Sequence, residues 1–263
     1  MIHTKQGPRI LTADIETLPI TTHNWHLFDE PRALDRLVKD WAIFMGAVKW
    51  YGDKKVHIMD TEATGDPYDD KEVVRWLCDL LGEADIVIGQ NVQKFDLRKI
   101  RARAILHGLK PFREPQVVDT LLMSREVAQF TSHKLEYMSG MVATKKSQHL
   151  KFPGFALWLG VIAGNPAAYK EARAYNRDDV KSTEELYLKL RPWARKHPNL
   201  AQYFDDEQRR CPRCGSSSIK FTGVIHRGVS TYDSYECNSC GGHSRSRYTQ
   251  NSKAKRASLI TCI

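Results

Sequence analysis

The chain has 263 residues, of which 41% are hydrophobic and 27% are charged, the composition of a globular protein. This length allows one good-sized core and a small second module. No apolar run approaches the roughly 18 to 20 residues that cross a bilayer. The first residues, MIHTKQGPRI, lack the apolar segment of a signal peptide. Composition thus argues against membrane-spanning and secreted proteins, and we expect a cytoplasmic one.

The formal net charge of +9 is concentrated near the C-terminus. Residues 208–263 hold ten Lys or Arg and only two acidic side chains, whereas residues 1–207 hold 30 basic and 29 acidic ones. A concentrated basic segment is typical of a surface that meets a polyanion. The alternative is a solvated tail that only keeps the protein soluble. The pattern favours nucleic acid as the partner.

The first part of the chain predicts three antiparallel strands. Residues 9–13, RILTA, are typical of a buried strand. A helix is expected over residues 33–41, ALDRLVKDW. Residues 41–60 contain two β-rich runs on either side of Gly52-Asp53, which indicates a hairpin.

Strands then alternate with helices. The expected elements are a helix over 70–84 with Gly82 as its C-cap, a strand over 85–91, a helix over 95–109, a strand over 116–120, helical segments through 142, and a long helix over 166–190. Three meander strands followed by this alternation imply an α/β protein with a mixed sheet and helices on its faces. That is the arrangement of an RNase H-like fold.

Carboxylates stand at three places where these elements meet. Asp14 and Glu16 are one residue apart on the first strand, so they point to the same face and repel unless a cation lies between them. Asp96 opens a helix after a strand, and Asp179 lies one helical turn after Tyr175. Hard cations such as Mg²⁺ prefer oxygen ligands. Taken singly, each acid could be an ordinary surface or helix-terminal residue.

Three motifs, taken in order, resemble those of a known family. DIET at 14–17, NVQKFD at 91–96 and YNRDD at 175–179 are similar to the exonuclease motifs of the DEDDy-type 3′-5′ exonucleases, in the DnaQ-like branch of the RNase H-like superfamily. The resemblance covers roughly residues 9–190. A nuclease followed by a cysteine-containing module also resembles predicted exonucleases of bacteriophages.

The resemblance implies catalytic roles for five side chains. Asp14, Glu16 and Asp179 would bind one divalent ion, Mg²⁺ or Mn²⁺, and Asp14 with Asp96 would bind a second. Two such ions, about 4 Å apart, can clamp an in-line displacement at phosphorus. Tyr175 would orient the attacking water, since a hydroxyl with a pKa near 10 is a poor base at neutral pH.

The resemblance also implies substrate contacts. Thr17 and Leu18 follow the first motif, where the family contacts the terminal nucleotide, and Asn91 would support the site or the substrate. Asn91 could equally be a strand-end cap. We therefore expect a two-metal 3′-5′ exonuclease on single-stranded DNA or RNA, in phage replication, proofreading or repair. The alternatives are an RNase H-like endonuclease, or a nucleic-acid-binding or polymerase-accessory protein with an idle site.

The C-terminal cysteines have the spacing C-x2-C-x22-C-x2-C, with Gly215 and Gly241 after the two pairs. The predicted ligands of one structural Zn²⁺ are Cys211, Cys214, Cys237 and Cys240. The residues between the pairs are β-rich, which predicts a zinc ribbon. Cys78 falls in an apolar helical pattern and is expected in the core, whereas Cys262 belongs to the tail.

We expect an exonuclease domain at 1–193, a linker at 194–209, and a zinc ribbon with a basic tail at 210–263. Arg245 and Arg247 lie just beyond the second cysteine pair, and such basic residues suit a phosphate backbone. They could instead dock on an acidic partner such as a DNA polymerase. No membrane contact is expected.

Overall fold

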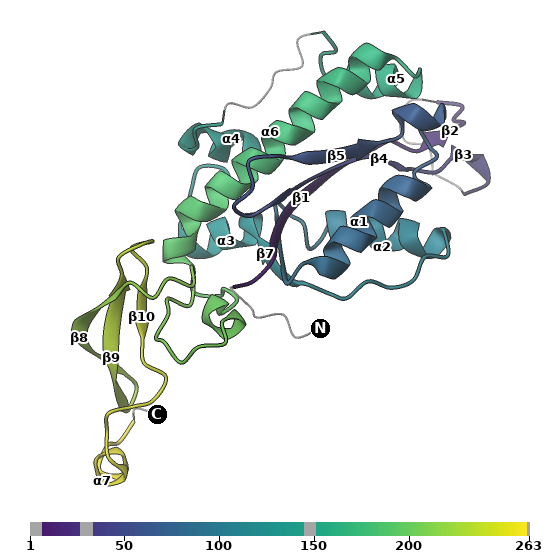
Figure 1. The fold of residues 1–263 in the computed structure, drawn as a ribbon. Helices are drawn as coiled ribbons and strands as arrows, with labels where there is room; N and C mark the ends of the chain where they lie inside the picture. Colours follow the sequence, from purple (N-terminus) through teal and green to yellow (C-terminus); the bar gives the residue numbers. More distant parts are fainter. Residues whose placement is uncertain (1–6, 27–33, 145–150, 262–263) are drawn as a thin grey trace. The chain divides into compact units, whose positions relative to one another are not determined.

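The computed structural model describes residues 7–26, 34–144 and 151–261 (Figure 1). The chain divides into two compact units. The larger unit holds residues 9–125 and 129–187, and the smaller one is formed mainly by residues 188–261.

The larger unit is built around a five-stranded sheet with the order β5-β4-β1-β6-β7. These strands are β1 (Ile10–Thr17), β4 (Ile43–Trp50), β5 (His57–Asp60), β6 (Ile86–Gly89) and β7 (Gln116–Asp119). The central β1 pairs antiparallel with β4 on one side and parallel with β6 on the other. This is the mixed sheet predicted for an RNase H-like fold, and its antiparallel hairpin β4–β5 is confirmed.

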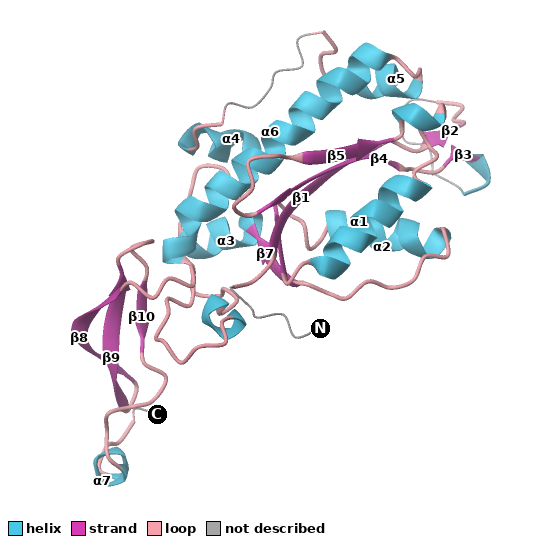
Figure 2. Ribbon diagram, in the orientation of Figure 1, coloured by secondary structure: helices cyan, strands magenta, loops and turns pink. Residues whose placement is uncertain are grey.

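Helices cover both faces of this sheet, as Figure 2 shows. They are α1 (Lys71–Glu83), α2 (Asp96–Leu106), α3 (Thr120–Val127), α4 (Leu135–Met138), α5 (Ala156–Ile162) and α6 (Pro166–Leu190). Shorter elements are the strands β2 (Thr21–Thr22) and β3 (Leu37–Lys39) and the 3₁₀ turns η1 (Leu34–Arg36), η2 (Glu62–Thr64) and η3 (Ser139–Met141). In the part of the chain that the structure describes, no helix combines the length and hydropathy that a membrane span needs.

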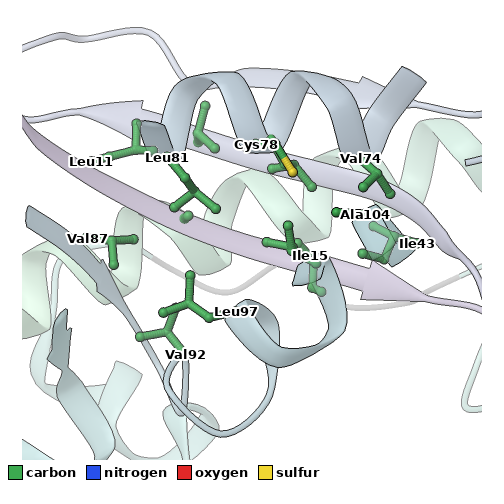
Figure 3. Close-up of a cluster of buried hydrophobic side chains, with 14 of the residues drawn as sticks. Leu11, Ile15, Ile43, Val74, Cys78, Leu81, Val87, Val92, Leu97 and Ala104 are labelled. Carbon is green, nitrogen blue, oxygen red and sulfur yellow. The ribbon is translucent and has the colours of Figure 1, made fainter. Parts of the chain in front are cut away.

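The two faces of β1 differ in chemistry. Leu11, Ala13 and Ile15 join a hydrophobic cluster with residues of α1 and α2, including the predicted core residue Cys78 (Figure 3). The alternate residues, which include Asp14 and Glu16, point to the opposite face, because successive side chains of a strand alternate. The apolar face of β1 therefore packs in the core, whereas its polar face directs Asp14 and Glu16 toward α6.

Polar contacts fix α6 to the sheet. Lys49 of β4 forms a largely buried ion pair with Glu184, with Nζ to Oε1 at 2.7 Å. Nearer the start of α6, Arg173 forms a partly buried ion pair with Asp60 at the end of β5, with Nε to Oδ2 at 2.6 Å. Breaking a pair that is shielded from water leaves an unpaired charge, which is costly. These two pairs therefore set where α6 lies along β1.

Three details of the sequence-based element prediction need correction. The helix expected at 33–41 is wrong: Ala33 lies outside the described residues, and the segment after it forms η1 and then β3, which pairs with β2. Its apolar residues stay exposed, so no helical face is buried there. Gly82 lies within α1 rather than capping it, and α5 was not predicted, because ALWLGVI carries no start signal.

The smaller unit contains a three-stranded antiparallel sheet with the order β10-β9-β8. Its strands are β8 (Ile219–Arg227), β9 (Ser230–Cys237) and β10 (His243–Arg245). The 3₁₀ turns η4 (Arg191–Trp193) and η5 (Leu200–Tyr203) precede the sheet, and the short helix α7 (Lys253–Ala257) follows it. The predicted β-rich C-terminal region with four cysteines is thereby confirmed.

Candidate active site

Three carboxylates from distant parts of the sequence come together on the polar face of β1. Asp14 and Glu16 extend from β1, and Asp179 extends from α6. One carboxylate oxygen from each lies within 4.8 Å of the other two. Asp179 is buried and the other two are partly buried. Like charges at this separation strongly disfavour full ionisation without a cation, so the cluster has the donor set and spacing of a site for a hard divalent ion.

Asn176 was not predicted as part of this site. It lies on α6, it has no exposed surface, and its side-chain amide donates a hydrogen bond to Oδ2 of Asp14. The amide therefore stabilises the charged form of Asp14 and fixes its orientation. The available signal was an amide inside the YNRDD motif, one residue after Tyr175.

Tyr175 lies beside the same carboxylates. Burial raises the pKa of its hydroxyl well above the ordinary value, and the charges of Asp179, Glu16 and Asp14 raise it further. The hydroxyl also forms a hydrogen bond with Asp179. Tyr175 is consequently protonated at neutral pH, which suits it to orienting a water molecule and not to accepting a proton.

Asp96 contacts the β1 backbone between the two carboxylates of that strand. It is the first residue of α2, it is buried, and its Oδ1 accepts a hydrogen bond from the Ile15 N–H at 3.1 Å. It does not belong to the three-carboxylate group. Burial raises the pKa of the Asp96 carboxyl to about 7, against the lowering effect of backbone N–H groups. The structure thus brings Asp96 to the strand segment that carries Asp14 and Glu16.

The loop between β6 and α2 is held by a carboxylate at the end of β7. Asp119 accepts hydrogen bonds from the backbone N–H of Asn91 at 3.1 Å and of Gln93 at 3.2 Å. Asn91 has a φ of 60°, a left-handed conformation that Asn adopts more readily than most residues. Asn91 therefore shapes the loop that leads to Asp96.

The predicted nucleotide contacts Thr17 and Leu18 line a hollow of about 400 Å³ at the end of β1. Leu18 itself is only 1% exposed and packs in a core cluster, so most of its surface is already occupied. Phe155, which caps the start of α5, and Trp158 within α5 also line the hollow, with their rings stacked at 6.3 Å between centroids. Lys99 lies on another wall. The hollow thus offers aromatic faces and one cationic group next to the first motif.

The four cysteines of the smaller unit form a second candidate metal site. Their Sγ atoms all lie within 4.8 Å of one another, with 3.7 Å between Cys211 and Cys240 and 3.5 Å between Cys214 and Cys237. These separations are far beyond a disulfide bond. They are near the roughly 3.8 Å that tetrahedral Zn–S bonds of about 2.3 Å require. The cluster therefore fits a zinc site.

Both cysteine pairs have the local geometry of metal-binding turns. The Gly215 N–H bonds to the Cys211 carbonyl, and the Gly241 N–H bonds to the Cys237 carbonyl. Both glycines have positive φ, of 76° and 72°, which explains why Gly follows each pair. Burial opposes ionisation of Cys237, but backbone N–H groups of Cys240 and Ser239 bring the pKa of its thiol to about 7.

Arg245 and Arg247 lie at and just beyond β10. The Arg245 guanidinium stacks over the Tyr232 ring, 3.8 Å from its centroid, and the Arg247 guanidinium lies 5.8 Å from the Tyr248 centroid. Stacking leaves the guanidinium edges available for hydrogen bonds to an anion. Both residues are exposed.

Comparison with protein-family profiles gave no match, and no curated protein sequence matches the chain. Among solved structures, the chain is similar to RNase D of Trypanosoma brucei, with a TM-score of 0.39 and 17% sequence identity. The aligned part covers 76% of this chain and 66% of that one, slightly less than two thirds of its length. A similarity this distant is no basis for a function.

Proposed function

We propose that the chain is a divalent-metal-dependent 3′-5′ exonuclease that hydrolyses phosphodiester bonds. The observation that carries this is the approach of Asp14 and Glu16 on β1 to Asp179 on α6, with their oxygens within 4.8 Å. Tyr175 stands beside them, as the motif resemblance implies. A cluster of carboxylates with a protonated tyrosine suits metal-assisted hydrolysis.

The residues present fit a divalent cation. Asp14, Glu16 and Asp179 would hold one ion, Mg²⁺ or Mn²⁺, and Asp14 with Asp96 would hold a second, with Asp96 acting directly or through water. When bound, such ions lower the pKa of the attacking water and stabilise the leaving 3′-oxygen. Because Asp96 is held by the Ile15 N–H, its carboxylate has a fixed position relative to the other ligands.

The chain's own residues would position the reactants. The Tyr175 hydroxyl, kept protonated by burial and by the neighbouring carboxylates, would orient the attacking water while hydrogen-bonded to Asp179. Asn176 would keep Asp14 in its metal-binding orientation. The hollow lined by Thr17, Phe155 and Trp158 would receive the terminal nucleotide, with its base against an aromatic face.

Single-stranded DNA or a frayed 3′ end is the proposed substrate, with RNA as the second candidate. A role in phage DNA replication, proofreading or repair, with a polymerase as partner, remains a prediction from the motif arrangement. The same proposal includes an exonuclease domain that ends at residue 193 and a zinc ribbon that begins at residue 210. It also includes one structural Zn²⁺ bound by the four cysteines.

Digestion of 5′-labelled oligonucleotides tests the activity. With Mg²⁺ or Mn²⁺ we expect a ladder that shortens from the 3′ end one nucleotide at a time, and no products with EDTA. Asp14→Ala should abolish cleavage while binding is retained. Cleavage that persists in this variant would show that Asp14 is not part of the mechanism. Cleavage rates measured in parallel on DNA and RNA would show which substrate the chain prefers.

Circular and 3′-blocked strands separate the alternatives. An exonuclease leaves a circular single strand intact, because the circle has no 3′ end. Circles cut as fast as linear strands would replace the exonuclease assignment with an endonuclease. Binding without any cleavage, under every metal tested, would favour a nucleic-acid-binding or accessory protein with an idle site.

A further inference from the structure

The smaller unit carries a hollow that lies outside the three sequence motifs of the proposed nuclease site. Its volume is about 590 Å³, and its walls come from the segment around η4 on one side and from the ribbon sheet on the other. The aromatic and basic side chains on these walls are Trp193, His197, His243, Arg195, Arg213, Arg227 and Arg245. No acidic side chain lines it. A concave surface with this composition attracts an anion.

Arg213 shows that the hollow is a built feature. Its Nε donates to the Ala194 carbonyl at 2.6 Å, and its Nη1 donates to the His243 carbonyl. One guanidinium therefore joins the segment before the ribbon to β10, and both walls are fixed in relation to each other. The Leu200 N–H to the Pro212 carbonyl, at 2.8 Å, ties the same two parts together.

The other arginines of this hollow keep their charge available. Among the described residues, Arg195, Arg227 and Arg245 form no ion pair with a carboxylate, in contrast to Arg210, which pairs with Asp206. Arg245 instead stacks over Tyr232 and donates to the Ser246 carbonyl. Three unpaired guanidiniums around one concavity repel one another, and an anion bound among them removes that repulsion.

A second hollow, of about 530 Å³, adjoins the first, because Pro212, Ser244 and Arg245 line both. It adds Arg247 and the ring of Tyr248 to the surface, together with Asp233, whose carboxylate accepts hydrogen bonds from the Gln250 amide and the Tyr235 hydroxyl. Two exposed aromatic rings, Trp193 at 72% and Tyr248 at 79%, belong to adjoining hollows that share Arg245. Both rings therefore offer a stacking face to a base beside a cationic group.

We propose that these two adjoining hollows bind a single-stranded nucleic acid, with its phosphates at Arg195, Arg227 and Arg245 and a base stacked on Trp193. Guanidiniums bind phosphate oxygens in a bidentate manner, and bases stack on aromatic rings without regard to sequence. An acidic peptide would use the arginines but not the exposed indole, and a duplex keeps its bases stacked internally. This inference rests on the proposed function only for the choice of nucleic acid as the polyanion.

Binding without cleavage tests the proposal and separates it from the activity. Full-length chain carrying Asp14→Ala is titrated into fluorescent oligothymidylate, and the dissociation constant is measured over a range of salt concentrations. Replacing Arg195, Arg227 and Arg245 together by Ala should reduce the log–log salt slope by about 2, since each single-strand phosphate contact contributes about 0.7. Trp193→Ala should weaken binding about 10-fold with the slope unchanged.

A matched variant removes three charges from the same unit outside both hollows, by replacing Lys220, Lys253 and Lys255 with Ala. It should keep most of the affinity, and an equal loss in the two triple variants would overturn the assignment of the hollows. A Trp193→Ala variant that binds oligothymidylate as tightly as its parent, or a duplex bound more tightly than the single strand, would overturn the single-strand assignment. Circular dichroism and zinc content show whether each variant is folded. Because the test measures binding and not cleavage, its result stays valid even if the chain proves to have no exonuclease activity.

Discussion

Asn176 connects the helix α6 to β1 through one hydrogen bond to Asp14. Because it orients a proposed metal ligand without being one, Asn176→Ala should raise the Mg²⁺ concentration needed for half-maximal cleavage and lower activity by about 10- to 100-fold. Metal titration of the cleavage rate measures this. Arg177→Ala, at an exposed neighbouring position on the same helix, is the control and should behave as the parent. Equal metal dependence in both variants would remove Asn176 from the site.

His197 makes stability depend on pH. Burial lowers the pKa of its imidazole to about 4, and its Nδ1 donates to the Pro198 carbonyl. The unfolded chain takes up the proton near pH 6.5, so the unfolded state holds more protons between these values. Stability of the smaller unit is therefore full above pH 6.5 and falls as pH drops toward 4, by up to about 3 kcal/mol.

Replacing His197 by Asn keeps a donor for the Pro198 carbonyl and removes the titration. Denaturant unfolding between pH 4 and pH 7 should show a flatter stability profile for this variant than for the parent. His226→Gln, at an exposed position, should leave the profile as it is. A parent-like loss of stability at low pH in His197→Asn would assign the acid sensitivity to other groups.

At the scale of the elements, β6 must pass very close to β1 and to the loop that follows. A Cβ on Gly89 would lie 2.6 Å from Cβ of Val92 and 2.9 Å from the Ala13 carbonyl oxygen. Gly89→Ala should therefore destabilise the larger unit by about 1–3 kcal/mol and displace the loop that leads to Asp96. Chemical denaturation and the cleavage rate measure the two effects.

Gly82→Ala provides the matched comparison. Gly82 lies within α1, and the nearest atom to an added Cβ is 3.6 Å away. Alanine is about 0.5–1 kcal/mol more favourable than glycine inside a helix, so this variant should be neutral or slightly more stable. A Gly89→Ala variant as stable as Gly82→Ala would show that the close approach of β6 is not required.

The elements with strong local patterns could be predicted from the sequence. α6 begins at Pro166 and ends at Leu190 as expected, because a helical apolar pattern, an N-terminal proline and Pro192 delimit it. The segment at 33–41 has a similar pattern, but its apolar side chains Leu34, Leu37 and Val38 stay exposed, and residues 34–39 form a turn and a short strand instead. Periodicity reports which residues could be buried together, whereas burial itself depends on the rest of the fold.

The site shows the same limit. Asp14, Glu16 and Tyr175 stood out because their motifs are short and local. The contact between Asn176 and Asp14 joins residues 162 positions apart, and it follows from the placement of α6 on the polar face of β1. Likewise, no local pattern indicated that Asp119 would bind the backbone at Asn91. Asp119 ends β7, whereas Asn91 lies in the loop between β6 and α2, 28 positions earlier in the sequence.

At the scale of the whole molecule, two units with separate metal sites should respond separately to metal removal. We expect one tightly bound zinc per chain. Cys237→Ser should lose that zinc and lower the unfolding temperature of the smaller unit, because bound metal stabilises only the folded form. Elemental analysis and scanning calorimetry measure both quantities. Cys78→Ala, which removes a thiol from the core of the larger unit, should retain the zinc, and zinc retained by Cys237→Ser would exclude the four-cysteine site.

The central claim is that Asp14, Glu16 and Asp179 share one divalent ion. Calorimetric titration of Mn²⁺ into the zinc-loaded chain tests it most directly, with Asp179→Asn compared against Asp178→Asn at the adjacent position, outside the three-carboxylate group. The account predicts a saturable Mn²⁺ site in the parent and in Asp178→Asn, and loss of that site in Asp179→Asn. Equal Mn²⁺ affinity in the two variants would contradict it.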